Sequence, residues 1–119
     1  MMQSAEQLPN GLTLLQHDDC FKLGQDSVLL SAFAHPRRFA KVLDLGAGTG
    51  ALSLLCWRAD LQITGLEIQP EAAQLFRQSI EANKLENVTV LEGDLRKIRN
   101  LLPHGCMDYV LCNPPYFKR

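Results

Sequence analysis

Four short apolar segments alternate with segments of helical character, and this alternation constrains the fold more than any other feature of the sequence. The apolar segments are rich in Val, Ile and Leu and cover residues 41–45, 62–68, 87–93 and 107–112. Short, continuous apolar strands separated by helices are typical of a parallel sheet with helices on both faces. We therefore expect an α/β fold with a four-stranded parallel sheet.

The segments between these strands have the spacing of apolar residues that helices require. A helix is expected from about residue 50 to residue 59. Pro70, which is favoured at a first helical position, begins another helix whose apolar residues recur at core spacing. Asp94 is expected to begin a short helix that runs to about residue 102.

The first 40 residues form an extension ahead of this alternating core. The initial residues are polar, and we expect them to be loosely held. An Asn-Gly turn signal then precedes a candidate strand of residues 12–15, and residues 26–34 are expected to form a capped helix. We divide residues 1–119, taken as one domain, into an extension of residues 1–40 and a core of residues 41–119.

Composition excludes several classes of protein. With 46% hydrophobic and 21% charged residues, the chain has the composition of a soluble globular domain. A net charge of −1 gives no electrostatic indication of nucleic-acid binding, and we interpret the basic clusters at 37–38, 96–99 and 118–119 as solvated surface. The sequence lacks a membrane-spanning apolar stretch and a secretory signal. The four cysteines lack metal-binding spacing, so we expect a reduced, cytoplasmic setting and no metal site.

In parallel sheets, ligands bind beyond the carboxyl ends of the strands, where the strand order reverses. The first predicted strand ends with Asp44, and Gly46, Gly48 and Gly50 follow it. Glycines at alternate positions allow a tight turn and bring backbone N–H groups close to a ligand. Close helix–strand packing, or a dinucleotide-binding pattern that ends at Ala51, would explain the same glycines.

Carboxylates at the next two strand ends extend this candidate site. Glu67 lies 23 residues after Asp44 and could accept hydrogen bonds from both hydroxyls of a ribose. We expect its neighbours Leu66 and Ile68 to be buried, and a buried carboxylate needs partners. Asp94 could accept from an adenine amino group, although a helix cap would explain it equally well.

These strand ends fit both a nicotinamide-dependent dehydrogenase and an S-adenosylmethionine-dependent enzyme. Asp44 favours the second class, because a carboxylate repels a pyrophosphate and attracts the ammonium group of a methionine. The turn Asn113-Pro114-Pro115-Tyr116 decides between them. Its prolines end the strand, and it offers an amide, an uncommitted carbonyl and an aromatic face. Such groups suit a planar substrate with an exocyclic NH₂, although the turn alone would also fit a plain strand ending.

Together these residues resemble the class I S-adenosylmethionine-dependent methyltransferases that modify amino nitrogens. Residues 44–50, Glu67, Asp94 and the Asn-Pro-Pro-Tyr turn follow the order seen in that family. Residues 21–30 further resemble a segment of the bacterial tRNA adenine-N6 methyltransferases that act beside the anticodon of a valine tRNA. The resemblance implies a Rossmann-like fold, S-adenosyl-L-methionine as cofactor and an RNA substrate, expected to be a tRNA.

The resemblance also implies a set of cofactor contacts. Within it, Asp44 and the glycines would hold the methionine part, Glu67 the ribose and Asp94 the adenine. The full set consists of Gly24, Asp26, Asp44, Gly46, Gly48, Gly50, Glu67, Ile68, Asp94 and Leu95.

For catalysis, the resemblance implies roles for three residues of the Asn-Pro-Pro-Tyr turn. Asn113 and the carbonyl of Pro114 would accept hydrogen bonds from the target NH₂, while Tyr116 would stack on the flipped base. An aromatic amine is a poor nucleophile, and two acceptors out of the ring plane favour a pyramidal nitrogen. Alignment then supplies much of the rate.

This family normally continues with further strands beyond the turn, so we expect a sheet that is truncated after its fourth strand. The exposed edge of residues 107–112 then predicts pairing with a second copy of the chain. Two alternatives stay open. One is methylation of a glutamine amide in a translation release factor. Enzymes of that kind usually carry a helical N-terminal substrate domain, whereas only about 40 residues precede the first strand of the core here. The other is a non-catalytic cofactor-binding fragment.

Overall fold

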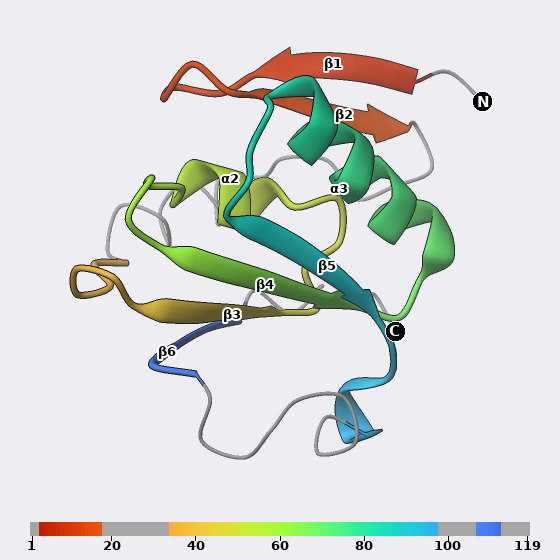
Figure 1. The fold of residues 1–119 in the computed structure, drawn as a ribbon. Helices are drawn as coiled ribbons and strands as arrows, with labels where there is room; N and C mark the ends of the chain where they lie inside the picture. The colour runs from red at the N-terminus through yellow and green to blue at the C-terminus, as the bar shows by residue number, and fades with distance from the viewer. Residues whose placement is uncertain (1–2, 18–33, 98–106, 113–119) are drawn as a thin grey trace.

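The computed structural model describes residues 3–17, 34–97 and 107–112. Its centre is a four-stranded parallel sheet in the order β5-β4-β3-β6 (Figure 1). The expected α/β class is confirmed, and the four predicted strands are present with ends that differ by at most two residues. They are β3 (Lys41–Leu45), β4 (Gln62–Glu67), β5 (Val88–Glu92) and β6 (Tyr109–Cys112).

The strand order reverses at β3. The chain adds β4 and then β5 on one side of β3, and afterwards places β6 on the other side. Leu45 at the end of β3 pairs with Leu66 of β4 and with Cys112 of β6, so these three strands end in one row. The region beyond the carboxyl ends of β3 and β6 is therefore the switch point at which sheets of this type bind ligands.

Two α-helices cover one face of this sheet (Figure 1). The longer, α3 (Pro70–Ala82), begins at the predicted proline. The shorter, α2 (Ala51–Leu55), ends earlier than the predicted end at residue 59. Beyond it the chain leaves the helical path, and the indole Nε1 of Trp57 donates to the side chain of Asn87, 2.8 Å away.

The remaining predicted helices are tested only in part. After Asp94 the structure shows one 3-10 turn, η1 (Leu95–Lys97), in place of the start of a longer helix. The rest of that helix, and nearly all of the helix predicted over residues 26–34, fall outside the described residues. In the described ranges, no helix is long and apolar enough to cross a membrane.

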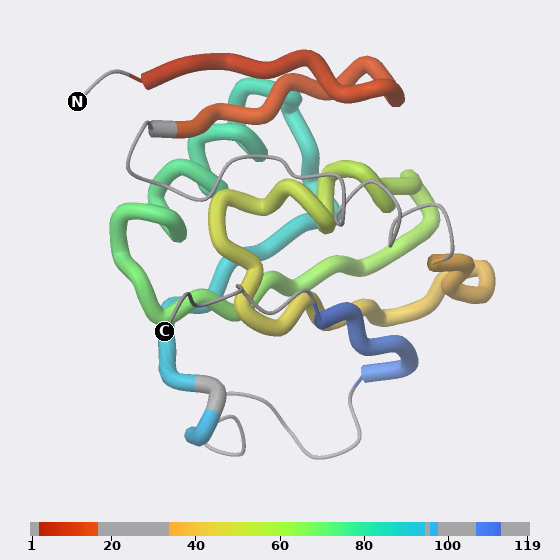
Figure 2. Tube along the Cα trace, turned by 180° about the vertical axis from the view of Figure 1, so that it is seen from behind, coloured from red at the N-terminus to blue at the C-terminus, as the bar shows by residue number. Residues whose placement is uncertain are grey.

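An antiparallel hairpin forms an additional layer outside the helices (Figures 1 and 2). Its second strand, β2 (Thr13–His17), agrees with the strand predicted over residues 12–15. Its first strand, β1 (Gln3–Gln7), corrects the expectation that the initial residues are loosely held. All five residues of β1 are exposed, so the strand carries no apolar alternation that could have revealed it.

Two polar side chains, one in α3 and one at the residue that directly follows it, hold the hairpin in place. The amide side chain of Asn83 accepts from the backbone N–H of Thr13 at 2.9 Å and donates to its carbonyl at 2.7 Å. The hydroxyl of Ser79 accepts from the N–H of Leu15 at 2.8 Å. Because these bonds use the free edge of β2, α3 covers backbone groups that would otherwise be unpaired.

The ring of Phe76, on α3, fixes the distance between the helix layer and the sheet. This side chain is fully buried, and two glycines lie against it. A Cβ atom added at Gly50 would lie 2.3 Å from Cδ1 of Phe76, and one added at Gly65 would lie 2.4 Å from Cε2. Both positions therefore need glycine for packing, in addition to any need of the turn after β3.

Candidate functional site at the carboxyl ends of the strands

The turn after β3 exposes backbone at the switch point. Gly46, Gly48 and Gly50 have φ angles of +64°, +59° and +92°, the left-handed region that favours glycine. Among the described residues, nothing lies within 4 Å of the position that a Cβ atom of Gly46 or Gly48 would occupy. The first two glycines thus leave room for a ligand against the backbone, whereas Gly50 is used for packing.

Glu67 connects this turn to the end of the neighbouring strand. It is the last residue of β4, and it is only 7% exposed. Its Oε1 accepts from the backbone N–H of Gly48 at 2.7 Å, and its Oε2 accepts from that of Gln69 at 2.9 Å. These two backbone N–H groups are the partners that we predicted this buried carboxylate to need. Each carboxylate oxygen can accept a second hydrogen bond, so Glu67 keeps capacity for the hydroxyls of a ligand.

Ile68 corrects one detail of the sequence analysis. We expected this side chain to be buried beside Glu67, but it is 58% exposed. The reason is that β4 ends at Glu67, so Ile68 lies beyond the buried run that closes this strand. An exposed apolar side chain therefore directly follows Glu67 in the chain.

Asp44 is buried below this surface. It is 1% exposed, and its Oδ2 accepts from the hydroxyl of Ser53, in α2, at 2.6 Å. Burial raises the pKa of Asp44 to about 6, although the Ser53 bonds oppose the shift and the charge of Glu67 adds to it. In this structure the carboxylate contacts α2, so its role toward a methionine ammonium stays a prediction.

Replacing Asp44 with Asn should stabilise the protein at neutral pH. The variant removes a buried charge and keeps an oxygen that can accept from Ser53. Because the folded pKa of about 6 exceeds the usual value of 3.8, the folded state binds more protons in between, and wild-type stability falls as pH rises through that window. We expect Asp44→Asn to be more stable by on the order of 2 kcal/mol at pH 7–8.

Chemical denaturation of both proteins between pH 4.5 and pH 8 measures this difference. The advantage of Asp44→Asn should shrink as the pH falls below about 6, because the wild-type carboxyl is then protonated as well. An advantage that is the same at every pH, or a variant that is less stable at pH 8, would contradict the assignment of a buried, strained charge.

The carboxylate of Asp94 is bound by Arg96, two residues further along the chain. Its oxygens accept from the backbone N–H of Arg96 at 2.9 Å and from the guanidinium at 2.6 to 3.1 Å. These bonds hold the pKa of Asp94 at about 2. The capping interpretation is thus the one that the structure shows, and an adenine amino group would have to share these oxygens with Arg96. Leu95 lies at the start of η1.

Five predicted site residues lie outside the described parts of the chain. Cys112, the last described residue of β6, pairs with Leu45, and the Asn-Pro-Pro-Tyr turn follows it in the sequence. The residues that lie outside the described ranges are Gly24, Asp26, Asn113, Pro114 and Tyr116. Their roles stay predictions.

Ser53 is the site residue that sequence reasoning missed. It is fully buried between Leu52 and Leu54, which are buried as well. A hydroxyl in an apolar helix turn needs a partner, and the acid nine positions earlier provides it. A search for buried polar pairs between the first strand and the first helix of the core would have found this contact.

Comparisons with known proteins agree with this architecture. The family model described as "Methyltransferase small domain" matches residues 22–119. A protein of Pseudoalteromonas translucida named tRNA1(Val) (adenine(37)-N6)-methyltransferase is 35% identical over 105 residues, which cover 86% of this chain and 44% of the relative. A protein of Yersinia pestis with the same name is 35% identical over 106 residues and covers 85% and 42%. The chain thus spans less than half the length of these relatives.

Solved structures show the same fold. The Thermus thermophilus 16S rRNA N2 G1207 methyltransferase, solved with AdoMet and guanosine, superposes with a TM-score of 0.79 at 25% identity and covers 98% of this chain and 33% of that one. The Pyrococcus abyssi tRNA (uracil-54, C5)-methyltransferase, solved with S-adenosyl-L-homocysteine, superposes with a TM-score of 0.74 at 17% identity. It covers 95% of this chain and 28% of that one.

Proposed function

Because the chain belongs to the methyltransferase small domain family, we propose that it forms the S-adenosylmethionine-binding part of an enzyme that methylates the N6 amino group of an adenine in RNA. The relatives named for adenine-37 of a valine tRNA support a tRNA as the substrate. A cytoplasmic location fits such a substrate and forms part of the proposal.

The position of Glu67 carries the cofactor assignment. Its carboxylate is fixed by the N–H groups of Gly48 and Gln69 and keeps lone pairs for two ribose hydroxyls. The exposed side chain of Ile68 offers an apolar contact for an adenine ring beside it. The open side of Gly46 leaves room for the amino-acid part. These residues fit S-adenosylmethionine, and Asp44 would act on its ammonium group through its charge.

The remaining groups of the site act on the substrate. When bound, S-adenosylmethionine supplies a methyl group activated by a sulfonium. We assign the amide oxygen of Asn113 and the carbonyl of Pro114 as acceptors for the two N–H groups of the adenine. Tyr116 would hold the flipped base by stacking. The last residue of β6, Cys112, pairs with the last residue of β3, Leu45. The Asn-Pro-Pro-Tyr turn and the glycine turn therefore follow neighbouring strand ends in the sequence.

Replacing Glu67 with Ala should weaken S-adenosylmethionine binding by about 1–3 kcal/mol, the range for hydrogen bonds to a charged group. Isothermal titration calorimetry with S-adenosylmethionine, S-adenosylhomocysteine and NAD, run in parallel, measures this effect. The wild type should bind the first two ligands and not NAD. Glu67→Gln is the matched control, because it keeps one acceptor for the glycine turn while losing the charge.

Two calorimetric results would overturn this assignment. Unchanged affinity in Glu67→Ala would leave Glu67 as a support of the turn alone. Binding of NAD in preference to S-adenosylmethionine would place the chain among nicotinamide enzymes. Cofactor binding without methyl transfer to RNA, in the longest available form of the protein, would favour the alternatives of a release-factor glutamine substrate or a non-catalytic module.

We further propose that the 119-residue chain pairs with a second copy through β6. Among the described strands, β6 bonds only to β3, and Val110 on it is 54% exposed. A strand edge of this kind attracts another strand, and a twofold axis would satisfy both copies. Sedimentation velocity at micromolar concentration should show a dimer. A monomer of 13.3 kDa that binds no apolar dye would contradict this proposal.

A further inference from the structure

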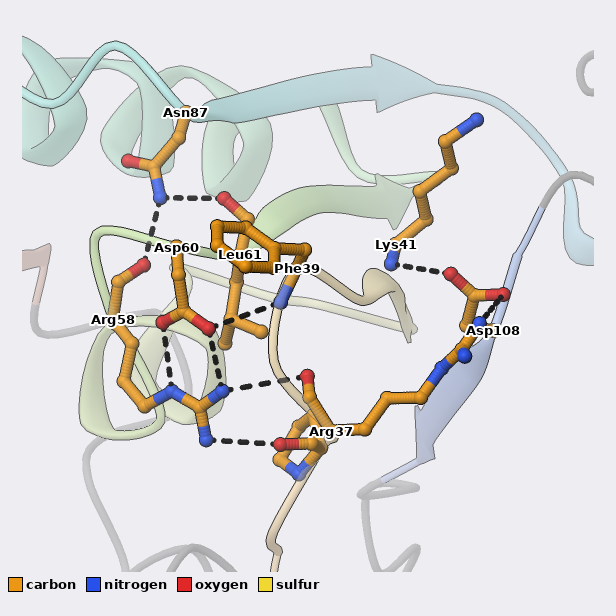
Figure 3. A network of polar contacts seen from close by, with 9 residues as sticks. Arg37, Phe39, Lys41, Arg58, Asp60, Leu61, Asn87 and Asp108 are labelled. Atoms are coloured by element: carbon orange, nitrogen blue, oxygen red, sulfur yellow. Dashed lines mark hydrogen bonds and ion pairs between the residues drawn. The ribbon is translucent and has the colours of Figure 1, made fainter.

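The loop of residues 36–40 precedes β3, so it lies at the opposite end of that strand from the glycine turn. Figure 3 shows its polar contacts. The guanidinium of Arg58 donates hydrogen bonds to both carboxylate oxygens of Asp60, at 3.0 and 2.8 Å, and to the carbonyl of Pro36 at 2.9 Å. The second oxygen of Asp60 also accepts from the backbone N–H of Phe39 at 3.1 Å. One ion pair therefore fixes the backbone on both sides of residues 37–38.

Phe39 has an unfavourable backbone conformation. Its φ angle is +63°, in the left-handed region, which costs a residue with a Cβ about 1–2 kcal/mol. Its ring is 71% exposed, so burial does not offset this cost. Strained backbone that the surroundings hold in place is a known feature of binding sites. Here the strained backbone conformation occurs at a residue whose aromatic ring is exposed to solvent.

Basic residues accompany this ring. The guanidinium of Arg38 lies over the ring, 5.7 Å from its centroid, and that of Arg37 is largely exposed while pairing with Asp108 at 2.9 Å. The loop and its neighbours hold four cations, Arg37, Arg38, Lys41 and Arg58, and two carboxylates, Asp60 and Asp108, which gives a net charge of +2. Arg37 and Arg58 are the two cations that pair with these carboxylates. An open depression of about 550 Å³ adjoins the loop, lined by residues 36–38 and 58–60.

We propose that Arg37, Arg38 and Phe39, here called the amino-end surface, form a second RNA contact of this protein. The guanidiniums would bind backbone phosphates, and the ring would stack on an unpaired base. An exposed aromatic ring next to two exposed arginines favours a nucleic acid over a small anion, which needs no ring. This inference rests on the proposed RNA substrate. It replaces the interpretation of the basic pair as plain solvated surface, because that interpretation explains neither the exposed ring nor the strain.

The amino-end surface lies far enough from the glycine turn to touch a different part of the RNA. β3 runs from Lys41 to Leu45, which corresponds to about 13 Å between its two ends. When the target adenine of an RNA lies at the carboxyl ends of the strands, other nucleotides of the same RNA would contact the amino-end surface. The surface would thus add affinity for the whole RNA and leave the methyl-transfer step unchanged.

Phe39→Gly and Arg38→Gln test the inference in the longest available form of the protein. Glycine adopts a φ of +63° without strain, so Phe39→Gly should keep or raise thermal stability while it removes the ring. Phe39→Tyr restores an aromatic face. Lys84→Gln is the matched control for lost charge, because Lys84 is exposed after the end of α3. The probe is an unmodified valine tRNA transcript, with fluorescence anisotropy measured over a series of salt concentrations.

Phe39→Gly should weaken tRNA binding by about fivefold or more, and Phe39→Tyr should bind like the wild type. Arg38→Gln should reduce the slope of log affinity against log salt by about 1. The maximal methylation rate at saturating tRNA and the affinity for S-adenosylmethionine should not change. Wild-type tRNA binding in both variants, or an equal loss in Lys84→Gln, would overturn the inference while the proposed function stands. A wild type that methylates no RNA would instead overturn the proposed function, and the inference with it.

Discussion

Asn113→Ala should lose methyl transfer while binding S-adenosylmethionine like the wild type. Its amide oxygen is the acceptor that we assign to the target amino group, and removing one positioned hydrogen-bonding group of this kind lowers rates by roughly 10²–10³-fold. Glu67 and the glycine turn, which carry the cofactor assignment, do not depend on this side chain for their described contacts. Single-turnover transfer to a tRNA transcript and parallel calorimetry measure the two quantities separately.

Asn113→Asp provides the matched control, because it keeps an acceptor oxygen at the same distance from the backbone. We expect it to retain more activity than Asn113→Ala. If Asn113→Ala lost cofactor binding together with methyl transfer, the residue would be a structural cap at the end of β6, and the assignment of the Asn-Pro-Pro-Tyr turn to substrate binding would be wrong.

Gly50→Ala should be the most destabilising single methyl addition in the turn after β3. The new Cβ would lie 2.3 to 2.7 Å from three ring atoms of Phe76, which is fully buried and cannot swing into solvent. Overpacking of a core costs about 1–3 kcal/mol, and the left-handed φ of +92° adds about 1–2 kcal/mol. The sum approaches the whole stability of a small domain.

Gly46→Ala separates these two contributions. Gly46 has a similar positive φ but, among the described residues, open space at its Cβ position, so only the backbone cost of about 1–2 kcal/mol is expected. Chemical denaturation of the two variants measures the difference. Equal losses in Gly50→Ala and Gly46→Ala would contradict the packing argument.

Phe76→Leu should destabilise the protein less in a Gly65→Ala background than in the wild type, because it removes the ring that the new methyl group meets.

The strands of the core could be predicted because each carries several Val, Ile or Leu residues in a short segment between helices and turns. The strand of residues 41–45 is one example, with three of its five residues buried. α3 could be predicted from Pro70 and its apolar spacing. β1 could not, because its five residues face solvent and are held by backbone pairing to β2, a contact that side-chain patterns do not record.

Within the site, the sequence identified acidic residues but not their partners. Asp44 and Glu67 stand at strand ends as predicted, yet the first bonds to Ser53 and the second to backbone N–H groups. Such contacts depend on how a turn folds back on the sheet, which spacing alone does not determine. The sequence left a cap or an adenine contact open for Asp94, and the bond from the N–H of Arg96 shows the cap.

The most direct test of the account is nucleoside mass spectrometry of an unmodified valine tRNA transcript after incubation with S-adenosylmethionine and the longest available form of the protein. The account predicts N6-methyladenosine at the adenine beside the anticodon, and none with Asn113→Ala. Methylation of another base, or no methylated nucleoside at all from a preparation that binds S-adenosylmethionine and the tRNA, would contradict it.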